Sequence, residues 1–289
     1  MQLIDTHQHL IYRNRIGYGW TAGIPALAEG DFTLDDYRAI TDGQGVRATL
    51  FMECAVDDAD YMAEARFVSE LMKADGSGLL GQIASCRPET DKGFSDWLDE
   101  AETLGAVGFR RVLHVMPDEL SQSETFRSGV REIGRRGRVF DMCFLGSQLH
   151  IARALAEACP DTALVLDHCG VPDIAGGDFD QWAAALTSLA GLPNVTVKLS
   201  GLTAYCAPGT ATAQTLRPWV EHVLASFGPE RMLWGGDWPV VNLGSGLPRW
   251  IDMTRDLLSE LSADEQAGIG YRTAQRVYRL PPDEALNRV

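Results

Sequence analysis

The sequence predicts one (β/α)8 TIM barrel that takes up residues 1–289 as a single domain. Short apolar runs alternate with longer segments of helical period along the whole chain, which is typical of parallel strands joined by crossover helices. The length of 289 residues fits either two small domains or one large barrel of this kind. A doubly wound sheet is the alternative, but neither G-x-G-x-x-G nor a P-loop follows the first apolar run.

The predicted elements follow this alternation in order. The eight expected strands lie near residues 2–7, 46–54, 79–85, 106–113, 138–144, 163–168, 194–200 and 231–237. Crossover helices are expected from the amphipathic segments at 34–41, 59–72, 148–158, 179–189 and 216–227. No linker, low-complexity tract or internal repeat divides the chain, which favours one domain.

The segment from residue 12 to residue 31 is rich in glycine, proline and aromatic residues and is expected to form a long loop after the first strand. Loops at this position cover the catalytic end of a barrel. Tyr18 and Trp20 therefore either line a pocket or pack the loop onto the rim of the barrel.

The composition excludes several classes of partner. A formal net charge of −15 argues against binding of nucleic acid or of an anionic membrane, because polyanions are held by basic patches. No apolar run is long enough to span a membrane and no secretion signal opens the chain, so we expect a cytoplasmic protein. The six cysteines are widely spaced without a C-x-x-C pair, which predicts reduced, mostly buried thiols. Both a monomer and a homo-oligomer are compatible with this composition.

The first strand ends in the run Asp5-Thr6-His7-Gln8-His9. The period of two in a strand predicts that Asp5, His7 and His9 point to one face. A lone buried histidine is usually a core or capping residue, but two imidazoles beside a carboxylate indicate a site for a metal ion or a polar substrate.

Polar residues also mark the carboxyl ends of other predicted strands, where barrels carry their active sites. They are Glu53, Arg110, His168, Lys198 and Asp237. Glu53 is either a site residue or the ion-pair partner of Lys198 or an arginine. Of the neighbours Arg110 and Arg111, only one can face inward, and Arg110 is favoured. The remaining histidines, His114, His150 and His222, are expected in loops or on the surface.

The set His7-x-His9, His168 and Asp237 resembles the amidohydrolase superfamily. The strings DHCG at 167–170, LSGL at 199–202, FGPER at 227–231 and GDWP at 236–239 are similar to its sugar-lactonase branch, the fuconolactonase- and rhamnonolactonase-like proteins. The similarity extends from residue 2 to about residue 280.

The resemblance implies roles for these residues. Asp237 would be the general base that activates water, and His7 and His9 would hold a divalent metal or bind substrate directly. The chain departs from the two-metal pattern, because no lysine ends the fourth strand and the fifth ends at Cys143-Phe144 without a histidine. One ion such as zinc held by some of His7, His9, Glu53 and Asp237 is compatible with the sequence, and so is a metal-free site.

The implied reaction is hydrolysis of a sugar lactone such as L-fuconolactone or L-rhamnonolactone to the sugar acid. Asp237 would take a proton from water, while His7, His9 or a metal polarises the carbonyl and His168 or Lys198 steadies the oxyanion or hydroxyls. The residues expected to contact substrate are Arg110, Lys198, Trp20 and Glu53. Lactone isomerisation, an amidohydrolase-type decarboxylation and non-catalytic binding of a sugar acid are the alternatives.

Overall fold

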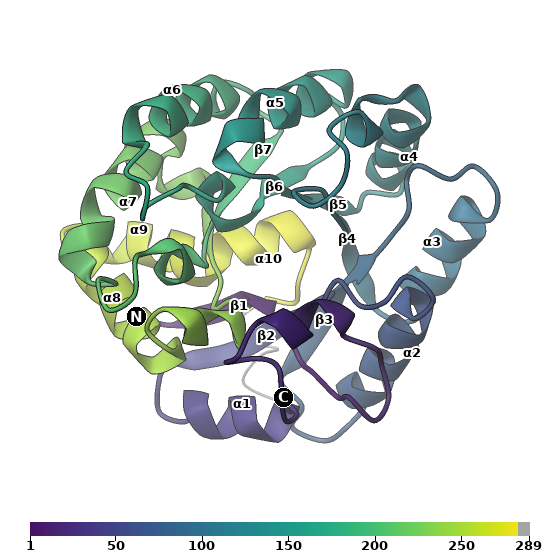
Figure 1. The fold of residues 1–289 in the computed structure, drawn as a ribbon, viewed down its shortest axis with the longest axis horizontal. Helices are drawn as coiled ribbons and strands as arrows, with labels where there is room; N and C mark the ends of the chain where they lie inside the picture. The colour runs from purple at the N-terminus through teal and green to yellow at the C-terminus, as the bar shows by residue number, and fades with distance from the viewer. Residues whose placement is uncertain (283–289) are drawn as a thin grey trace.

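Eight parallel strands form the centre of the molecule, and each pairs with its neighbours in sequence order (Figure 1). The structure is a computed structural model and describes residues 1–282; the last residues of the predicted domain, 283–289, lie outside the described residues. The strands are β1 Leu3–Gln8, β2 Val46–Met52, β3 Leu79–Ser85, β4 Ala106–Val112, β5 Val139–Cys143, β6 Leu164–Leu166, β7 Val195–Leu199 and β8 Met232–Trp234. A parallel bridge from Gln8 to Trp238 brings the first and last strands together, so the sheet is a nearly closed barrel.

A ring of helices covers the outside of this barrel, one after each strand (Figure 1). They are α1 Leu34–Thr41, α2 Tyr61–Met72, α3 Phe94–Thr103, α4 Glu124–Arg135, α5 Leu149–Ala158, α6 Phe179–Ala190, α7 Ala213–Phe227 and α8 Leu247–Leu257. Helix α4 shows why these segments pack inward, since its apolar residues Phe126, Val130 and Ile133 recur at helical spacing and are all buried. The predicted (β/α)8 barrel is confirmed.

The predicted boundaries of β3 and α1 agree with the structure, but β6 and β8 are shorter than expected. β6 ends at Leu166 because His168 beyond it has a φ of 52°, which extended backbone does not allow. Similarly, β8 ends at Trp234, and Asp237 beyond it has a φ of 56°. Both residues expected on strand ends therefore lie in turns that follow the strands.

Two apolar layers hold the barrel together. The larger one lies between the sheet and the outer helices, and a smaller one inside the barrel includes Ile4, Leu50, Ile83 and Val165. Helices α9 Ala263–Ala267 and α10 Thr273–Tyr278 follow α8, and α10 adds Tyr278 to the inner layer. Figure 1 shows α10 across the centre of the ring, where it closes one end of the barrel. The opposite end of the barrel, where the strands have their carboxyl ends, is where a functional site is expected.

The described part of the chain contains no helix with the length and apolar character that crossing a membrane requires. All six cysteines are free thiols and five of them are buried, as the sequence predicts.

Candidate active site

His7 near the end of strand β1 and His9 just after the strand lie at the open end of the barrel, but Asp5 does not lie beside them. The register of β1 against β2 shifts between Asp5 and Gln8. Asp5 instead accepts hydrogen bonds from the Tyr37 hydroxyl of α1 at 2.6 Å and from the Gly236 amide at 2.7 Å. The prediction that all three side chains share one face is wrong for Asp5, because the shift breaks the strict alternation of a strand.

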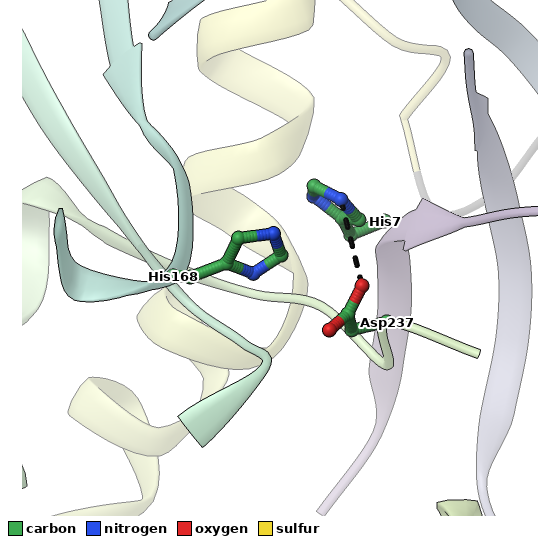
Figure 2. A group of neighbouring side chains, drawn as sticks. All are labelled: His7, His168 and Asp237. Atoms are coloured by element: carbon green, nitrogen blue, oxygen red, sulfur yellow. Dashed lines mark ion pairs between the residues drawn. The ribbon is translucent and has the colours of Figure 1, made fainter. Parts of the chain in front are cut away.

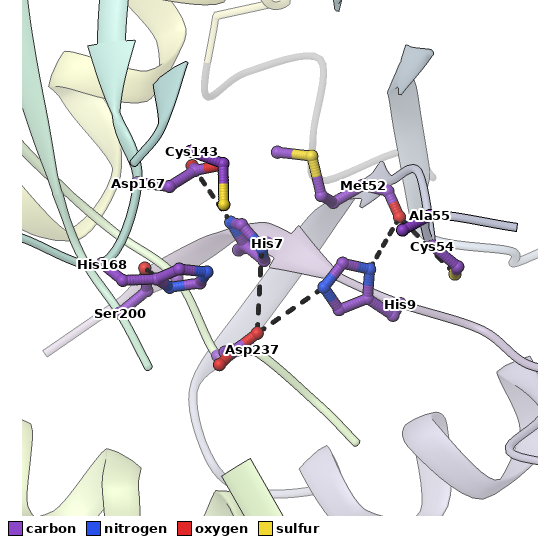
Figure 3. A network of polar contacts seen from close by, with 12 residues as sticks. His7, His9, Met52, Cys54, Ala55, Cys143, Asp167, His168, Ser200 and Asp237 are labelled. Atoms are coloured by element: carbon purple, nitrogen blue, oxygen red, sulfur yellow. Dashed lines mark hydrogen bonds and ion pairs between the residues drawn. The ribbon is translucent and has the colours of Figure 1, made fainter. Parts of the chain in front are cut away.

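The imidazole of His9 is oriented by a hydrogen bond to the barrel. Its Nδ1 lies 2.9 Å from the carbonyl oxygen of Met52, and a carbonyl can only accept, so Nδ1 donates. Its Nε2 lies 3.5 Å from Oδ1 of Asp237 (Figure 3). The second ring nitrogen of His9 is therefore aimed at the Asp237 carboxylate.

His7 is fully buried between charged groups. Nη1 of Arg110, which can only donate, lies 3.3 Å from Nε2 of His7, and Nζ of Lys198, also a donor, lies 3.3 Å from Nδ1. Nδ1 also lies 3.3 Å from the Asp167 carboxylate. Burial holds the pKa of His7 well below its usual value, so the ring is neutral near pH 7. Nε2 of His7 lies 3.8 Å from the same Oδ1 of Asp237.

His168 and Asp237 reach the site from turns with left-handed backbone. Their φ values of 52° and 56° are strained for residues with a side chain, a feature that clusters at functional sites. The amide of Asp237 donates to the His7 carbonyl at 2.8 Å, and Nδ1 of His168 lies 2.9 Å from the Ser200 hydroxyl. A Cβ on Gly201 would lie 2.5 Å from Nδ1 of His168, so glycine is required for this approach.

Three of these side chains form a group that could hold a metal ion (Figure 2). One ligand atom from each of His7, His168 and Asp237 lies within 4.8 Å of the others. Oδ2 of Asp237 is buried and has no hydrogen-bond partner among the described residues. Two imidazoles whose pKa values are lowered by burial, beside a carboxylate oxygen without a partner, fit a divalent ion such as zinc.

Glu53, which the sequence placed among the possible metal ligands, is held elsewhere. Its Oε1 accepts from Nε of Arg110 at 2.6 Å and its Oε2 from the amide of Ala55 at 2.9 Å. Burial alone would raise the pKa of Glu53, but Arg110 keeps it below its usual value. Glu53 is therefore a buried anion paired with Arg110, and His168 takes its place in the three-residue group.

Lys198 lies below the site rather than in it. Its ammonium is fully buried, 2.7 Å from Oδ1 of Asp141 and 2.9 Å from Oδ1 of Asp167. The Tyr278 hydroxyl also donates to Asp141, at 2.7 Å. Burial would lower the pKa of Lys198, but the two carboxylates raise it, so the lysine is charged. This network supports His7 from beneath through Asp167.

A cavity of about 280 Å³ opens above these residues. Its walls include His9, Arg110, His168 and Asp237, together with Trp20, Cys54, Ala55, Val112, His114, Val115, Cys143, Tyr205 and Val240. Of the two aromatic loop residues, Trp20 lines the cavity and donates its indole N–H to the Cys54 carbonyl at 2.8 Å. Tyr18 is buried and packs the loop onto the barrel. Arg110 faces the cavity, whereas Arg111 pairs with Glu89.

Sequence reasoning missed Tyr205 and His114 as residues of this cavity. Nδ1 of His114 lies 3.1 Å from Sγ of Cys143, and burial lowers the pKa of His114 to about 4. Both residues stand in loops beyond the strands, so the placement of polar groups at strand ends does not reveal them. The other two histidines lie outside the cavity. His150 is exposed, as expected, whereas His222, which was expected on the surface, is half-buried and packs on Trp182 in the helical layer.

Comparison with known proteins identifies the family of this chain. The amidohydrolase family model matches residues 4–280. The chain is 38% identical over 244 residues to an L-fucono-1,5-lactonase of Burkholderia ambifaria, which covers 83% of this chain and 81% of the relative. It is 29% identical to an L-fucono-1,5-lactonase of Burkholderia multivorans over 96% of both proteins. A crystal structure of a Burkholderia multivorans amidohydrolase with bound zinc superposes with a TM-score of 0.88 at 27% identity, covering 97% of this chain and 100% of the other.

Proposed function

Since the chain belongs to the amidohydrolase family, we propose that it hydrolyses the lactone of a sugar acid, with Asp237 as the general base. The observation that carries this proposal is the convergence of Nε2 of His7 and Nε2 of His9 on one oxygen of Asp237, at 3.8 and 3.5 Å. The other oxygen of that carboxylate is buried and has no hydrogen-bond partner among the described residues, and Asp237 is one of the residues that line the cavity. In the proposal, a water molecule in the cavity donates a hydrogen bond to the Asp237 carboxylate.

In the proposed reaction, Asp237 takes a proton from this water as the water oxygen forms a bond to the lactone carbonyl carbon. The carbon–oxygen bond of the ring then breaks, and Asp237 returns the proton to the departing ring oxygen. The product is the open hydroxy acid, so every atom of water and lactone is accounted for. A lactone carries its leaving alkoxide on the same molecule and needs less assistance than an amide.

The remaining residues of the site bind and orient. His7 and His168 are buried, and burial lowers the pKa of each, so both act as neutral ligands or hydrogen-bonding groups rather than as cations. Arg110 borders the cavity and places a positive charge near the developing oxyanion. Trp20 contributes an apolar wall on the loop side. Lys198 and Glu53 hold this set in place from below.

The metal proposal rests on the group of His7, His168 and Asp237, with His9 adjacent. A divalent ion held there would act as a Lewis acid toward the lactone carbonyl. Burial lowers the pKa of His7 and of His168, so these rings are neutral and can offer a lone pair, and Oδ2 of Asp237 has no hydrogen-bond partner among the described residues.

The direct test is Asp237→Asn, assayed by acid release from five- and six-membered aldonolactones, including L-fuconolactone and L-rhamnonolactone. We expect kcat to fall about 10²–10⁴-fold, because the amide cannot accept the proton. Asp180→Asn, an exposed change on α6, is the matched control. Retained turnover in Asp237→Asn would contradict the assignment, and product analysis by chromatography would distinguish the open acid from an isomerised lactone.

A further inference from the structure

A second cavity of about 390 Å³ lies beside the catalytic cavity, and Tyr205 lines both of them. We infer that this second cavity binds an uncharged polyhydroxylated substituent of the lactone ring, with the Tyr205 hydroxyl hydrogen-bonded to the substrate where it passes between the two cavities. The inference rests on the proposed lactonase function and specifies the class of lactone that the site takes.

The two cavities are built on the same stretch of backbone. His168 faces the catalytic cavity, and Val171, Pro172 and Asp173 line the second one. Between them the chain makes a compact turn with positive φ at His168 and at Val171, and the amide of Gly146 bonds the Val171 carbonyl at 3.1 Å. The wall of the second cavity is therefore fixed at a short chain distance from the proposed catalytic histidine.

The lining of the second cavity suits a polyol. Ser147, Asp173, Asp178 and Gln181 present exposed side chains that donate to or accept from hydroxyl groups. Trp182 supplies a fixed aromatic wall, because its indole N–H donates to the Cys169 carbonyl at 2.9 Å.

The charge of the lining excludes an acidic substituent. Among the described residues that line this cavity there is no lysine or arginine, whereas two aspartates, Asp173 and Asp178, do line it. A carboxylate or phosphate on the substrate would meet like charge there without a compensating cation. A neutral sugar ring or polyol chain meets no such repulsion.

Tyr205 is half-buried, unlike Tyr37 and Tyr278, whose buried hydroxyls donate to Asp5 and Asp141 at 2.6 and 2.7 Å. The Tyr205 hydroxyl bonds no residue in the described part of the chain, and the ring centroid of Tyr205 lies 6.1 Å from that of His168. Since this hydroxyl is not enclosed by protein and Tyr205 lines both cavities, it is free to bond a hydroxyl of the substrate.

The test compares glucono-1,5-lactone with its galactosyl-substituted form, lactobiono-1,5-lactone, and uses the double variant Asp178→Ala/Gln181→Ala. We expect kcat/KM for the galactosyl lactone to fall about tenfold, because hydrogen bonds to the substituent are lost, with little change for the plain lactone. Asp180→Ala, which is exposed on the same helix but does not line the cavity, should leave both values unchanged. Tyr205→Phe should lower kcat/KM for both lactones.

Calorimetric binding of gluconate and lactobionate makes the inference testable without turnover. If lactobionate binds more tightly than gluconate and the double variant loses this difference, the second cavity is supported even when neither lactone is hydrolysed. The absence of hydrolysis would then count against the proposed lactonase function alone. Equal binding of the two acids, or an equal fall in kcat/KM for both lactones in the double variant, would overturn the inference. Hydrolysis of the plain lactone would in that case still support the lactonase proposal.

Discussion

The fully buried ion pairs of Lys198 offer a quantitative test of how the floor of the site is held. The ammonium lies 2.7 Å from Asp141 and 2.9 Å from Asp167, and neither carboxylate is exposed. Lys198→Met keeps most of the side-chain volume but leaves two buried carboxylates without their shared cation. Removing one partner of a buried pair costs about 3–5 kcal/mol. For a chain of this size, we expect the Tm to fall by about 6–20 °C.

The loss should depend on pH in a defined direction. Burial raises the pKa of Asp141 to about 6 even with Lys198 beside it. A carboxyl whose folded pKa lies above its unfolded value binds more protons when folded, so stability falls as pH rises through that window. Without the ammonium the pKa of Asp141 rises further, so the pH range over which the protein loses stability extends to higher pH. The destabilisation by Lys198→Met should therefore be larger at about pH 8 than at about pH 5.

Thermal unfolding followed by circular dichroism at the two pH values measures this effect. Lys92→Met, at an exposed position, is the control, and the double variant Lys198→Met/Asp141→Asn should recover part of the loss because one stranded charge is gone. A Tm within about 2 °C of the unsubstituted protein would refute the reasoning. So would a loss that is equal at both pH values.

Three further predictions concern acid stability, backbone and metal. Burial lowers the pKa of His114 to about 4, so the neutral form of His114 stabilises the fold above about pH 6.5, and this contribution is lost as the pH falls toward 4. In chelator-treated protein, His114→Gln should therefore reduce the loss of stability between these two pH values, whereas His150→Gln, at an exposed position, should not. Gly201→Ala should lower kcat strongly, because its Cβ would lie 2.5 Å from His168. Gly209→Ala is also at positive φ but has open space around it, so it should lower stability without changing kcat. Steady-state kinetics and thermal melts distinguish these two effects. Chelator-treated protein should take up one zinc ion per chain in a metal-binding titration and gain thermal stability on doing so; no uptake would contradict the proposed centre.

The alternation of apolar runs and helical segments determined the barrel. Each strand and helix needs its own spacing of buried residues, and this spacing is a local property of the sequence. Segments with a strong local pattern, such as 34–41 and 79–85, also have the predicted boundaries. The polar residues that end strands are informative for the same reason, since parallel strands bring their carboxyl ends to one face. His7, His9, His168 and Asp237 thus lie together at one end of the barrel, as expected.

Only the tertiary structure decided which of these groups face the cavity and which lie beneath it. Glu53 pairs with Arg110, and Lys198 with Asp141 and Asp167, because a buried charge takes the nearest counter-charge and the pairing depends on distances across the barrel. The left-handed turns that aim His168 and Asp237 leave no spacing pattern in the sequence. Tyr205 likewise reaches the cavity from a loop, where position is set by packing against other loops rather than by local periodicity.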